Sequence, residues 1–420
     1  MRSLLVVVLL GGCSLIVDPP RPAHPEVLVN SIPNLDQGNP VAAFANERFL
    51  VVWQDSSLTA PDISEDAIRG RFLDKDGVPQ ASDFLINDPT TSRFAQEKPA
   101  IASIGSNLLV VWTDLSGLGA DTNSAIRARV VSTTGDFLSG EVVVNTTLTG
   151  VQEDPAVAAG ADDTFMIVWT DSSLATPDLD GQGIRGRRIG ITGAAKDASD
   201  VSINSITAGN QDHPTIAHGS DGRFLVVWTD TPATAPSDIH GRLLSATGVP
   251  LGSDLVINTA LTGAQTEPFV TATTTGYFVC WTDESLGAGD VDGKAVRARL
   301  LDQNGVGISD DFVLNTTTRG DQGHPRSAML LDGSLFVVFE DASLQSPDTD
   351  GNGVRARRLD STGMPVGDDF LVNTFYGADQ EDPSLVADDA GRVLAVWEDA
   401  SAPPPDDSGD GIEARFYSAQ

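Results

Sequence analysis

The sequence predicts an all-β protein, a seven-bladed β-propeller built from four-stranded antiparallel blades. Three observations lead to this fold class: a repeat of about 58 residues, four strand-like segments in each repeat, and a chain that is permuted by one strand relative to its repeats. No segment shows a sustained helical period of apolar residues, so we expect few helices.

The clearest mark of the repeat is an apolar run that ends in Trp-x-Asp. All six tryptophans of the chain occupy this position, and a phenylalanine takes it in one further repeat. The aromatic marks are Trp53, Trp112, Trp169, Trp228, Trp281, Phe339 and Trp397. The aspartates that follow them are Asp55, Asp114, Asp171, Asp230, Asp283, Asp341 and Asp399. This regularity indicates a structural role for both marks.

Three more marks recur once in each unit and place the other strands. A Gln-x-x-Pro precedes the first strand, an Arg lies in the third, and an Asn ends the fourth. The arginines are Arg71, Arg129, Arg187, Arg242, Arg299, Arg357 and Arg415. The asparagines are Asn30, Asn87, Asn145, Asn204, Asn258, Asn315 and Asn373. We expect the Asp and Arg marks to form a cross-strand ion pair, or the Arg to stack near the Trp.

The second strand must be covered on both faces, because runs such as 224–228 are apolar without alternation. Blades stacked face to face around an axis provide this cover. The first strand is rich in alanine, which suits a crowded innermost position.

The two ends of the sequence predict how the ring closes. The last repeat stops at Phe416-Tyr417, after its third strand, and the missing fourth strand is found at Glu26 to Asn30. Pairing the N-terminal strand with the last blade would remove two exposed strand edges. A solenoid or a row of sandwiches is the alternative.

The units resemble those of bacterial secreted and surface proteins with tandem FLVVWTD…IRGR…IN…QxxP β-propeller-type repeats. The resemblance covers nearly all of residues 26–417. It implies the architecture and brings no catalytic motif.

The N-terminus reads as a lipoprotein signal peptide (1–12), a lipidated cysteine with a tether (13–25), and then the propeller (26–420). Arg2 and the apolar run 4–10 precede Leu-Gly-Gly-Cys13, which resembles a bacterial lipobox. Ser14, in place of Asp, resembles outer-membrane sorting, so we expect a lipid-anchored protein in the cell envelope of a Gram-negative bacterium. An ordinary secretory signal is the alternative.

The charge balance excludes one class of partner and favours others. With 59 acidic and 26 basic residues, the formal net charge is −33, which disfavours nucleic acid. The membrane would be reached through the lipid anchor only. Acidic loops between strands two and three, and before strand one, are expected to share one face of the propeller. A protein or polysaccharide partner on this face is expected.

Three loops suggest a possible cofactor, Ca²⁺. Their candidate ligands are Asp178 with Asp180, Asp290 with Asp292, and Asp348 with Asp350. The Asp-x-Asp-Gly spacing resembles the start of a calcium loop, since Ca²⁺ prefers six to eight oxygen ligands. The pattern lacks the later acidic ligands of an EF-hand, and aspartates that cap their own turn are the alternative.

The regular repetition favours a non-enzymatic binding or scaffold module, because catalysis needs residues that break the repeat. No catalytic residue is therefore assigned. The residues that do break it are Arg326, His213, His324 and His240. Two alternatives remain: a propeller enzyme of the glycosidase or lyase type with its site at the channel mouth, and a calcium-stabilised structural protein. An unequal set of polar residues at that mouth would favour the enzyme.

Overall fold

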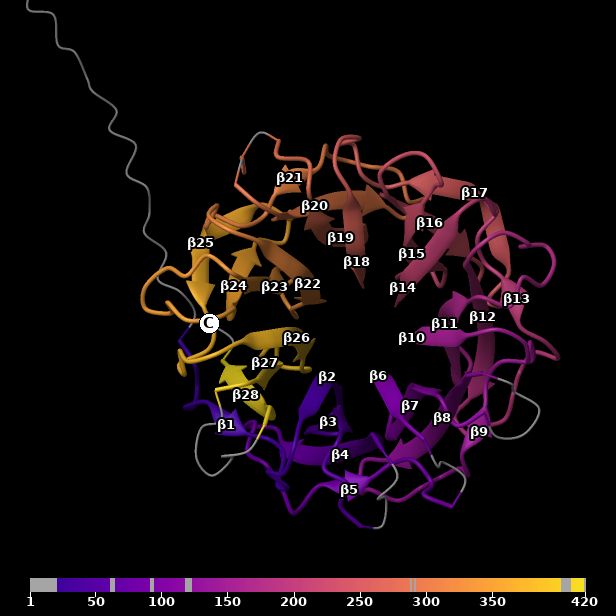
Figure 1. The fold of residues 1–420 in the computed structure, drawn as a ribbon, viewed down its shortest axis with the longest axis horizontal. Helices are drawn as coiled ribbons and strands as arrows, with labels where there is room; N and C mark the ends of the chain where they lie inside the picture. Colours follow the sequence, from indigo (N-terminus) through magenta and orange to yellow (C-terminus); the bar gives the residue numbers. More distant parts are fainter. Residues whose placement is uncertain are drawn as a thin grey trace, which may run out of the picture.

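The structure is a computed structural model that describes residues 21–60, 65–90, 94–117, 123–287, 289–290, 292–401 and 409–418. In these residues every element is a strand, and the strands form seven four-stranded sheets around a central axis (Figure 1). This confirms the seven-bladed all-β propeller. The predicted signal peptide and Cys13 lie outside the described residues. No helix of the described part is long and apolar enough to cross a membrane.

Each blade runs from the axis outward in chain order, and neighbouring strands within it are antiparallel. Blade 1 contains β2 (Gln37–Ala45), β3 (Arg48–Asp55), β4 (Ala67–Asp74) and β5 (Phe84–Leu85). Blade 2 contains β6 (Gln96–Ile104), β7 (Asn107–Asp114), β8 (Ala125–Ser132) and β9 (Val142–Val143). Blade 3 contains β10 (Gln152–Ala159), β11 (Thr164–Asp171), β12 (Gly183–Gly190) and β13 (Val201–Ser202). Blade 4 contains β14 (Asn210–His218), β15 (Phe224–Thr231), β16 (Asp238–Leu244) and β17 (Pro250–Val256).

The remaining blades follow the same plan until the chain ends meet. Blade 5 contains β18 (Gln265–Ala272), β19 (Gly276–Asp283), β20 (Ala295–Asp302) and β21 (Phe312–Val313). Blade 6 contains β22 (Gln322–Met329), β23 (Leu335–Asp341), β24 (Gly353–Leu359) and β25 (Pro365–Leu371). Blade 7 contains β26 (Gln380–Ala387), β27 (Val393–Asp399), β28 (Gly411–Tyr417) and, as its fourth strand, β1 (Val27–Leu28).

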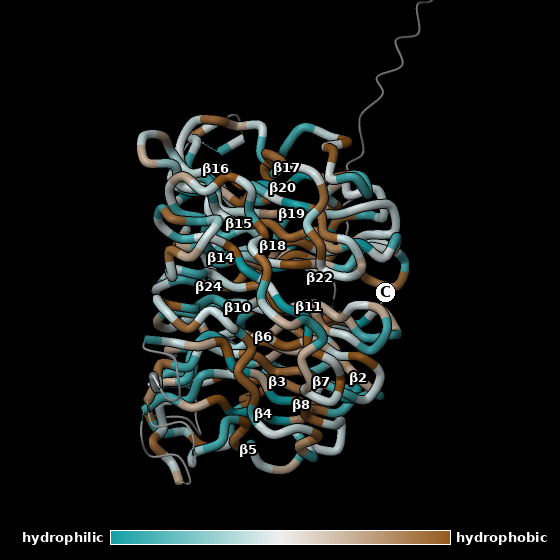
Figure 2. The backbone as a smooth tube through the Cα atoms, turned by 90° about the vertical axis from the view of Figure 1, so that its right-hand side faces the viewer, coloured by the Kyte–Doolittle hydropathy of each residue, from teal (hydrophilic) through white to brown (hydrophobic). Residues whose placement is uncertain are grey.

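The core lies between blades rather than at the centre of the ring. The apolar run of each second strand packs on both neighbouring sheets, and all six tryptophans are 0 % exposed. Seen edge-on, apolar stretches fill the strands between two faces of loops (Figure 2). The marks Trp53 through Trp397 are therefore packing residues, as the repetition indicated.

The ring is closed by its two ends, as predicted. Val27 pairs with Ala414 and Leu28 with Glu413, and β1 and β28 lie side by side in Figure 1. The buried Asn30 side chain accepts a hydrogen bond from the Ile412 N–H at 2.9 Å. The same bond recurs at the six other asparagine marks, so the closing strand reproduces a contact that every blade makes.

The structure corrects the role expected for the repeated arginine. Arg187 donates to the carbonyl of Val144 in the preceding blade at 2.8 Å, and its equivalents do the same. The ion pair to the repeated Asp comes instead from the residue two positions earlier, as Arg185 to Asp171 at 2.5 Å. The two arginines lie on the same face of one strand. One therefore joins strands within a blade and the other joins blades.

Candidate functional site

A cavity of about 340 Å³ opens at the mouth of the central channel, at the ends of the seven innermost strands. It lies on the face that carries the loops between the second and third strands of each blade, the acidic face of the sequence analysis. Its volume falls within the range of small-molecule sites. The wall is formed by the residue before the proline of each Gln-x-x-Pro mark and the residue after it, together with the proline itself in every blade except blade 6.

The residue before the proline is held in an unusual backbone conformation in every blade. Each innermost strand has a bulge at this point, and all seven residues have φ between 48° and 56°. This left-handed conformation costs roughly 1 kcal/mol or more for a residue other than glycine. A bulge re-aims a side chain, here toward the channel mouth. We call these seven positions the rim.

The rim is unequal, although the backbone around it repeats. Its residues are, in ring order, Asn39, Lys98, Asp154, His213, Glu267, His324 and Asp382. From Lys98 onward, basic and acidic side chains alternate. An identical framework thus presents seven positions of which no two neighbours are alike, which is the pattern that the sequence analysis assigned to an enzyme.

His324 joins two carboxylates at the rim. Its Nε2 lies 2.9 Å from Glu267 Oε1, and its Nδ1 lies 2.7 Å from Glu340 Oε2. Burial opposes the charge on His324, but these two hydrogen bonds and the carboxylate charges outweigh it and raise the pKa of the imidazole to about 10. The ring is therefore an imidazolium at neutral pH.

Glu267 is correspondingly held in its ionised form. Burial opposes ionisation, but the hydrogen bond and charge of His324, together with a 2.9 Å hydrogen bond from Thr282 Oγ1, lower the pKa of Glu267 to about 2. About a third of its side chain stays exposed, at 31 %. It is an ionised carboxylate that faces the cavity.

Asp382, on the other side of His324, has the opposite tendency. Burial and the charge of Glu340 raise its pKa, against the opposing influence of His324 and Arg326. Glu398 lies behind it, and burial, with the charges of Asp382 and Asp410, raises the pKa of Glu398 to about 8. Glu398 therefore stays largely protonated at neutral pH, and Asp382 keeps its proton to a higher pH than an ordinary aspartate.

On the opposite side of the rim, at blades 2 to 4, the charged side chains contact one another in a row. Lys98 Nζ lies 2.5 Å from Asp154 Oδ1, and His213 Nε2 lies 3.8 Å from Asp154 Oδ2. A hydrogen bond with Asp212 raises the pKa of His213 against burial. Burial also raises the pKa values of two glutamates on this side, Glu97 and Glu153, but neither of them lines the cavity.

Two residues of the second strands also break the repeat here. The residue between Trp and Asp is Thr or Gln in five blades, but it is Glu340 in blade 6 and Glu398 in blade 7. In several blades the side chain between Trp and Asp accepts a hydrogen bond from the backbone N–H of the rim residue in the next blade. Thr282 Oγ1 accepts from His324 at 3.2 Å, and Glu340 Oε1 accepts from Asp382 at 2.8 Å. The two glutamates keep this structural contact and add charge to the site.

The sequence analysis named three members of this site, His213, His324 and Arg326, without joining them to anything. All three line the cavity, whereas His240 lies elsewhere and faces Asp230 at 3.7 Å. The carboxylates Glu267, Glu340 and Asp382 were missed as site residues. The signal that could have found them is variation at one fixed position of an otherwise regular repeat.

The candidate calcium residues are engaged in their own loops. Asp178 Oδ1 accepts the N–H of Asp180 at 3.2 Å, and Asp178 Oδ2 accepts Asn204 Nδ2 at 2.9 Å. Asp290 and Asp348 make the same pair of contacts, and the three partners Asp180, Asp292 and Asp350 are exposed. In the described residues no three His, Cys, Asp or Glu side chains form a metal-sized group. Calcium binding stays a prediction.

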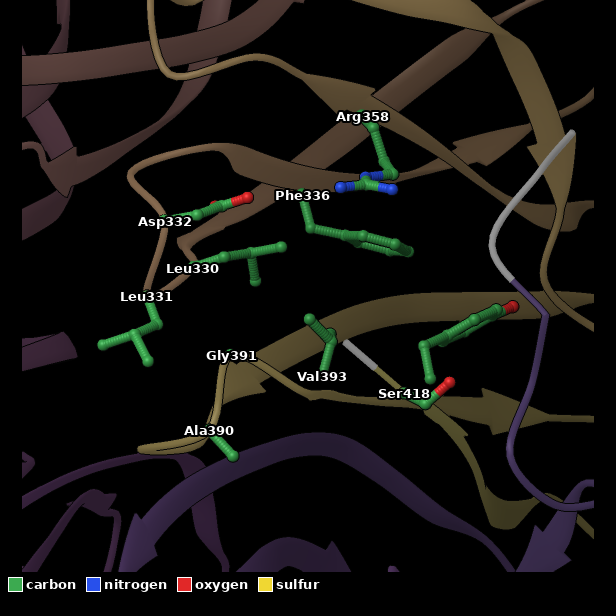
Figure 3. A pocket seen from close by; sticks show the side chains of 10 residues that line it. Leu330, Leu331, Asp332, Phe336, Arg358, Ala390, Gly391, Val393 and Ser418 are labelled. Atoms are coloured by element: carbon green, nitrogen blue, oxygen red, sulfur yellow. The ribbon is translucent and has the colours of Figure 1, made fainter. Parts of the chain in front are cut away.

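A second hollow of about 230 Å³ lies on the opposite face, between blades 6 and 7 (Figure 3). Leu331, Phe336 and Val393 give it an apolar wall, with Arg358 at one side. At other blade junctions a glycine turn of the following blade covers this place, as Gly363 does on Leu300. Within the described residues no such turn follows β28. The hollow is thus explained by blade packing.

Comparison with known proteins supports the fold. No protein-family model and no curated protein matches the chain. A protein of unknown function from Dyadobacter fermentans is similar in structure, with a TM-score of 0.56 and 12% identity over 95% of this chain and 99% of that one. The GH93 α-L-arabinofuranosidase of Fusarium graminearum, solved with arabinobiose, has a TM-score of 0.52 and 11% identity, covering 94% and 96%. An α-L-arabinanase of Penicillium chrysogenum, also with arabinobiose, gives 0.50 and 11%, covering 94% and 99%. At 11–12% sequence identity, these structural similarities establish a shared fold.

These findings correct the expectation that the protein is not an enzyme. Solved structures that share its fold over nearly the whole chain include glycoside hydrolases. The expectation also rested on the equivalence of the blades, and the rim is not equivalent from blade to blade. The alternative that placed an enzyme site at the channel mouth is the better reading.

Proposed function

We propose that the protein is a glycoside hydrolase whose active site is the channel mouth at blades 5 to 7. One observation carries this proposal: two carboxyl groups in one cavity have pKa values moved in opposite directions, with that of Glu267 at about 2 and that of Asp382 raised. Enzymes that cleave glycosidic bonds use such a pair, in which one carboxyl group keeps its proton and the other is ionised. The α-L-arabinofuranosidase and the α-L-arabinanase that share the fold support this class of reaction.

The two carboxyls have distinct roles in this proposal. Asp382 is the general acid: its proton goes to the glycosidic oxygen as the C–O bond breaks, so the alcohol leaves neutral. Glu267, which is ionised, either takes a proton from the attacking water or attacks the anomeric carbon itself. In the second case water then releases the sugar, and Asp382 takes the proton of that water. His324 is a positioning residue, because it holds Glu267 in its ionised state and in place.

The proposal is tested by a hydrolysis screen with matched variants. Purified protein is incubated with arabinan, arabino-oligosaccharides and a panel of other polysaccharides, and the release of reducing ends is measured. Asp382→Asn and Glu267→Gln are each expected to lower the rate about 100-fold or more. Glu284→Gln is the control, because this glutamate pairs with Lys294 at 3.0 Å away from the cavity. No hydrolysis of any glycan, or hydrolysis that survives both substitutions, refutes the proposal.

The expected location accords with this activity and is proposed with it. A lipid on Cys13 would hold the enzyme in the cell envelope, where extracellular glycans or their fragments are found. The proline-rich residues before Glu26 would act as a short tether.

A further inference from the structure

Arg326 is the least compensated charge in the cavity. In the other blades the residue after the rim proline is Val41, Ala100, Ala156, Thr215, Phe269 or Ser384, so only blade 6 places a cation on the channel wall here. Its guanidinium makes one hydrogen bond, from Nη1 to the carbonyl of Pro325 at 3.0 Å. Within the described residues no carboxylate oxygen lies within 4.0 Å of it. Four of its five N–H donors are left without a protein partner there.

The neighbouring charges leave Arg326 free to act on a ligand. Glu267, the ionised carboxylate beside it, already shares its oxygens with His324 and Thr282. Asp382 retains its proton more readily than an ordinary aspartate. Arg326 lies instead over the ring of Phe269, at 5.4 Å from its centre. The aromatic face attracts the guanidinium group but does not neutralise its charge.

We propose that Arg326 binds a carboxylate on the sugar, so that the substrate is an acidic glycan containing uronic acid. A guanidinium fork matches a carboxylate with two parallel hydrogen bonds, and these bonds are strongest where water is excluded. A neutral sugar would leave the charge without a partner in a half-buried channel. That the bound glycan is a substrate rests on the proposed function. The binding of a carboxylate by Arg326 does not depend on it.

The acidity of the whole protein does not oppose this binding. The net charge is −33, and exposed acidic residues such as Asp180 and Asp350 lie in the loops of this same face, but at physiological salt charges beyond about 8 Å are largely screened. The cavity wall itself carries Lys98, His324 and Arg326 beside Asp154, Glu267 and Asp382. The chain has only 26 lysines and arginines against 59 acidic residues, so this is a local concentration of cations.

The test measures binding without turnover. The Asp382→Asn variant is titrated with trigalacturonate and with the neutral galactotriose at physiological salt, and affinity is followed by calorimetry. We expect trigalacturonate to bind at least about tenfold more tightly, the size of one charged hydrogen-bond pair. Adding Arg326→Met should abolish the preference, because methionine keeps an unbranched side chain over Phe269 without the charge.

A second arginine on the same face is the control. Arg319 is exposed in the loop before β22, outside the cavity, and Arg319→Met should keep the preference. Equal affinity for the two trisaccharides, or an equal loss in both arginine variants, overturns the inference. If uronate binds through Arg326 but no glycan is hydrolysed, the binding site stands and the proposed hydrolase fails. If only neutral glycans are hydrolysed, the proposed hydrolase stands and the inference of an acidic substrate fails.

Discussion

Replacing His324 by glutamine should change stability in a way that depends on pH. His324 has a pKa of about 10 in the folded protein against an ordinary value of 6.5, and Glu267 has about 2 against 4.5. A shift of 3.5 units would correspond to about 5 kcal/mol if undamped. The histidine side chain is 40 % exposed, so solvent screening reduces this to roughly 1–2 kcal/mol.

The sign of the effect follows from the direction of each shift. A raised histidine pKa stabilises the fold fully below pH 6.5, and this contribution is lost as the pH rises toward 10. A lowered glutamate pKa stabilises fully above pH 4.5, and this is lost as the pH falls toward 2. The wild type should therefore exceed His324→Gln most strongly between pH 4.5 and 6.5.

The assay is urea unfolding of both proteins at pH 5.5 and pH 9.5. We expect a difference of about 1–2 kcal/mol at the lower pH that shrinks clearly at the higher one. His24→Gln is the control, because the His24 side chain is exposed and lies outside the rim. A difference between wild type and His324→Gln that is the same at both pH values would refute the charged triad of Glu267, His324 and Glu340.

Three further predictions concern closure, anchoring and calcium. Asn30→Ala removes the acceptor of the Ile412 N–H and the donor to Gln37, so it should lower the free energy of unfolding by about 2–4 kcal/mol. Hydrogen exchange at β1 and β28 should become faster, and unchanged exchange at both strands would contradict closure by this contact. Cys13→Ser should move the protein from the membrane to the soluble fraction of the cell envelope, and a variant that stays with membranes would disprove lipidation. If the Asp178, Asp290 and Asp348 loops bind Ca²⁺, chelator should lower the melting temperature, and an unchanged temperature counts against calcium.

The fold was predictable because its determinants repeat. A tryptophan at one position in six units, and a strand missing at one end but present at the other, favour a closed ring of equivalent blades, which the structure confirms. The partner of each arginine was not predictable. Arg185 and Arg187 share one face of the same strand, and the pairing register decides which of them contacts Asp171. Arg185 pairs with Trp169, two residues from Asp171, whereas Arg187 pairs with Ile167.

The site was harder to predict, because it depends on a conformation that the sequence does not reveal. Nothing in Gln-x-x-Pro indicates that the residue before proline adopts a positive φ, a conformation rare for residues such as lysine and glutamate. The bulge brings residues of different repeats, about 58 positions apart, to one cavity. His324 and Glu267 contact each other only because adjacent blades place their rim residues side by side.

The most direct test of the central claim is a crystal structure of the Asp382→Asn variant with an oligosaccharide that the wild type cleaves. The account predicts that the glycosidic oxygen lies beside residue 382, with the anomeric carbon facing Glu267 and the sugar chain in the channel mouth of blades 5 to 7. A ligand seated in the hollow between Leu331 and Val393, or on the outer edge of a blade, would contradict it.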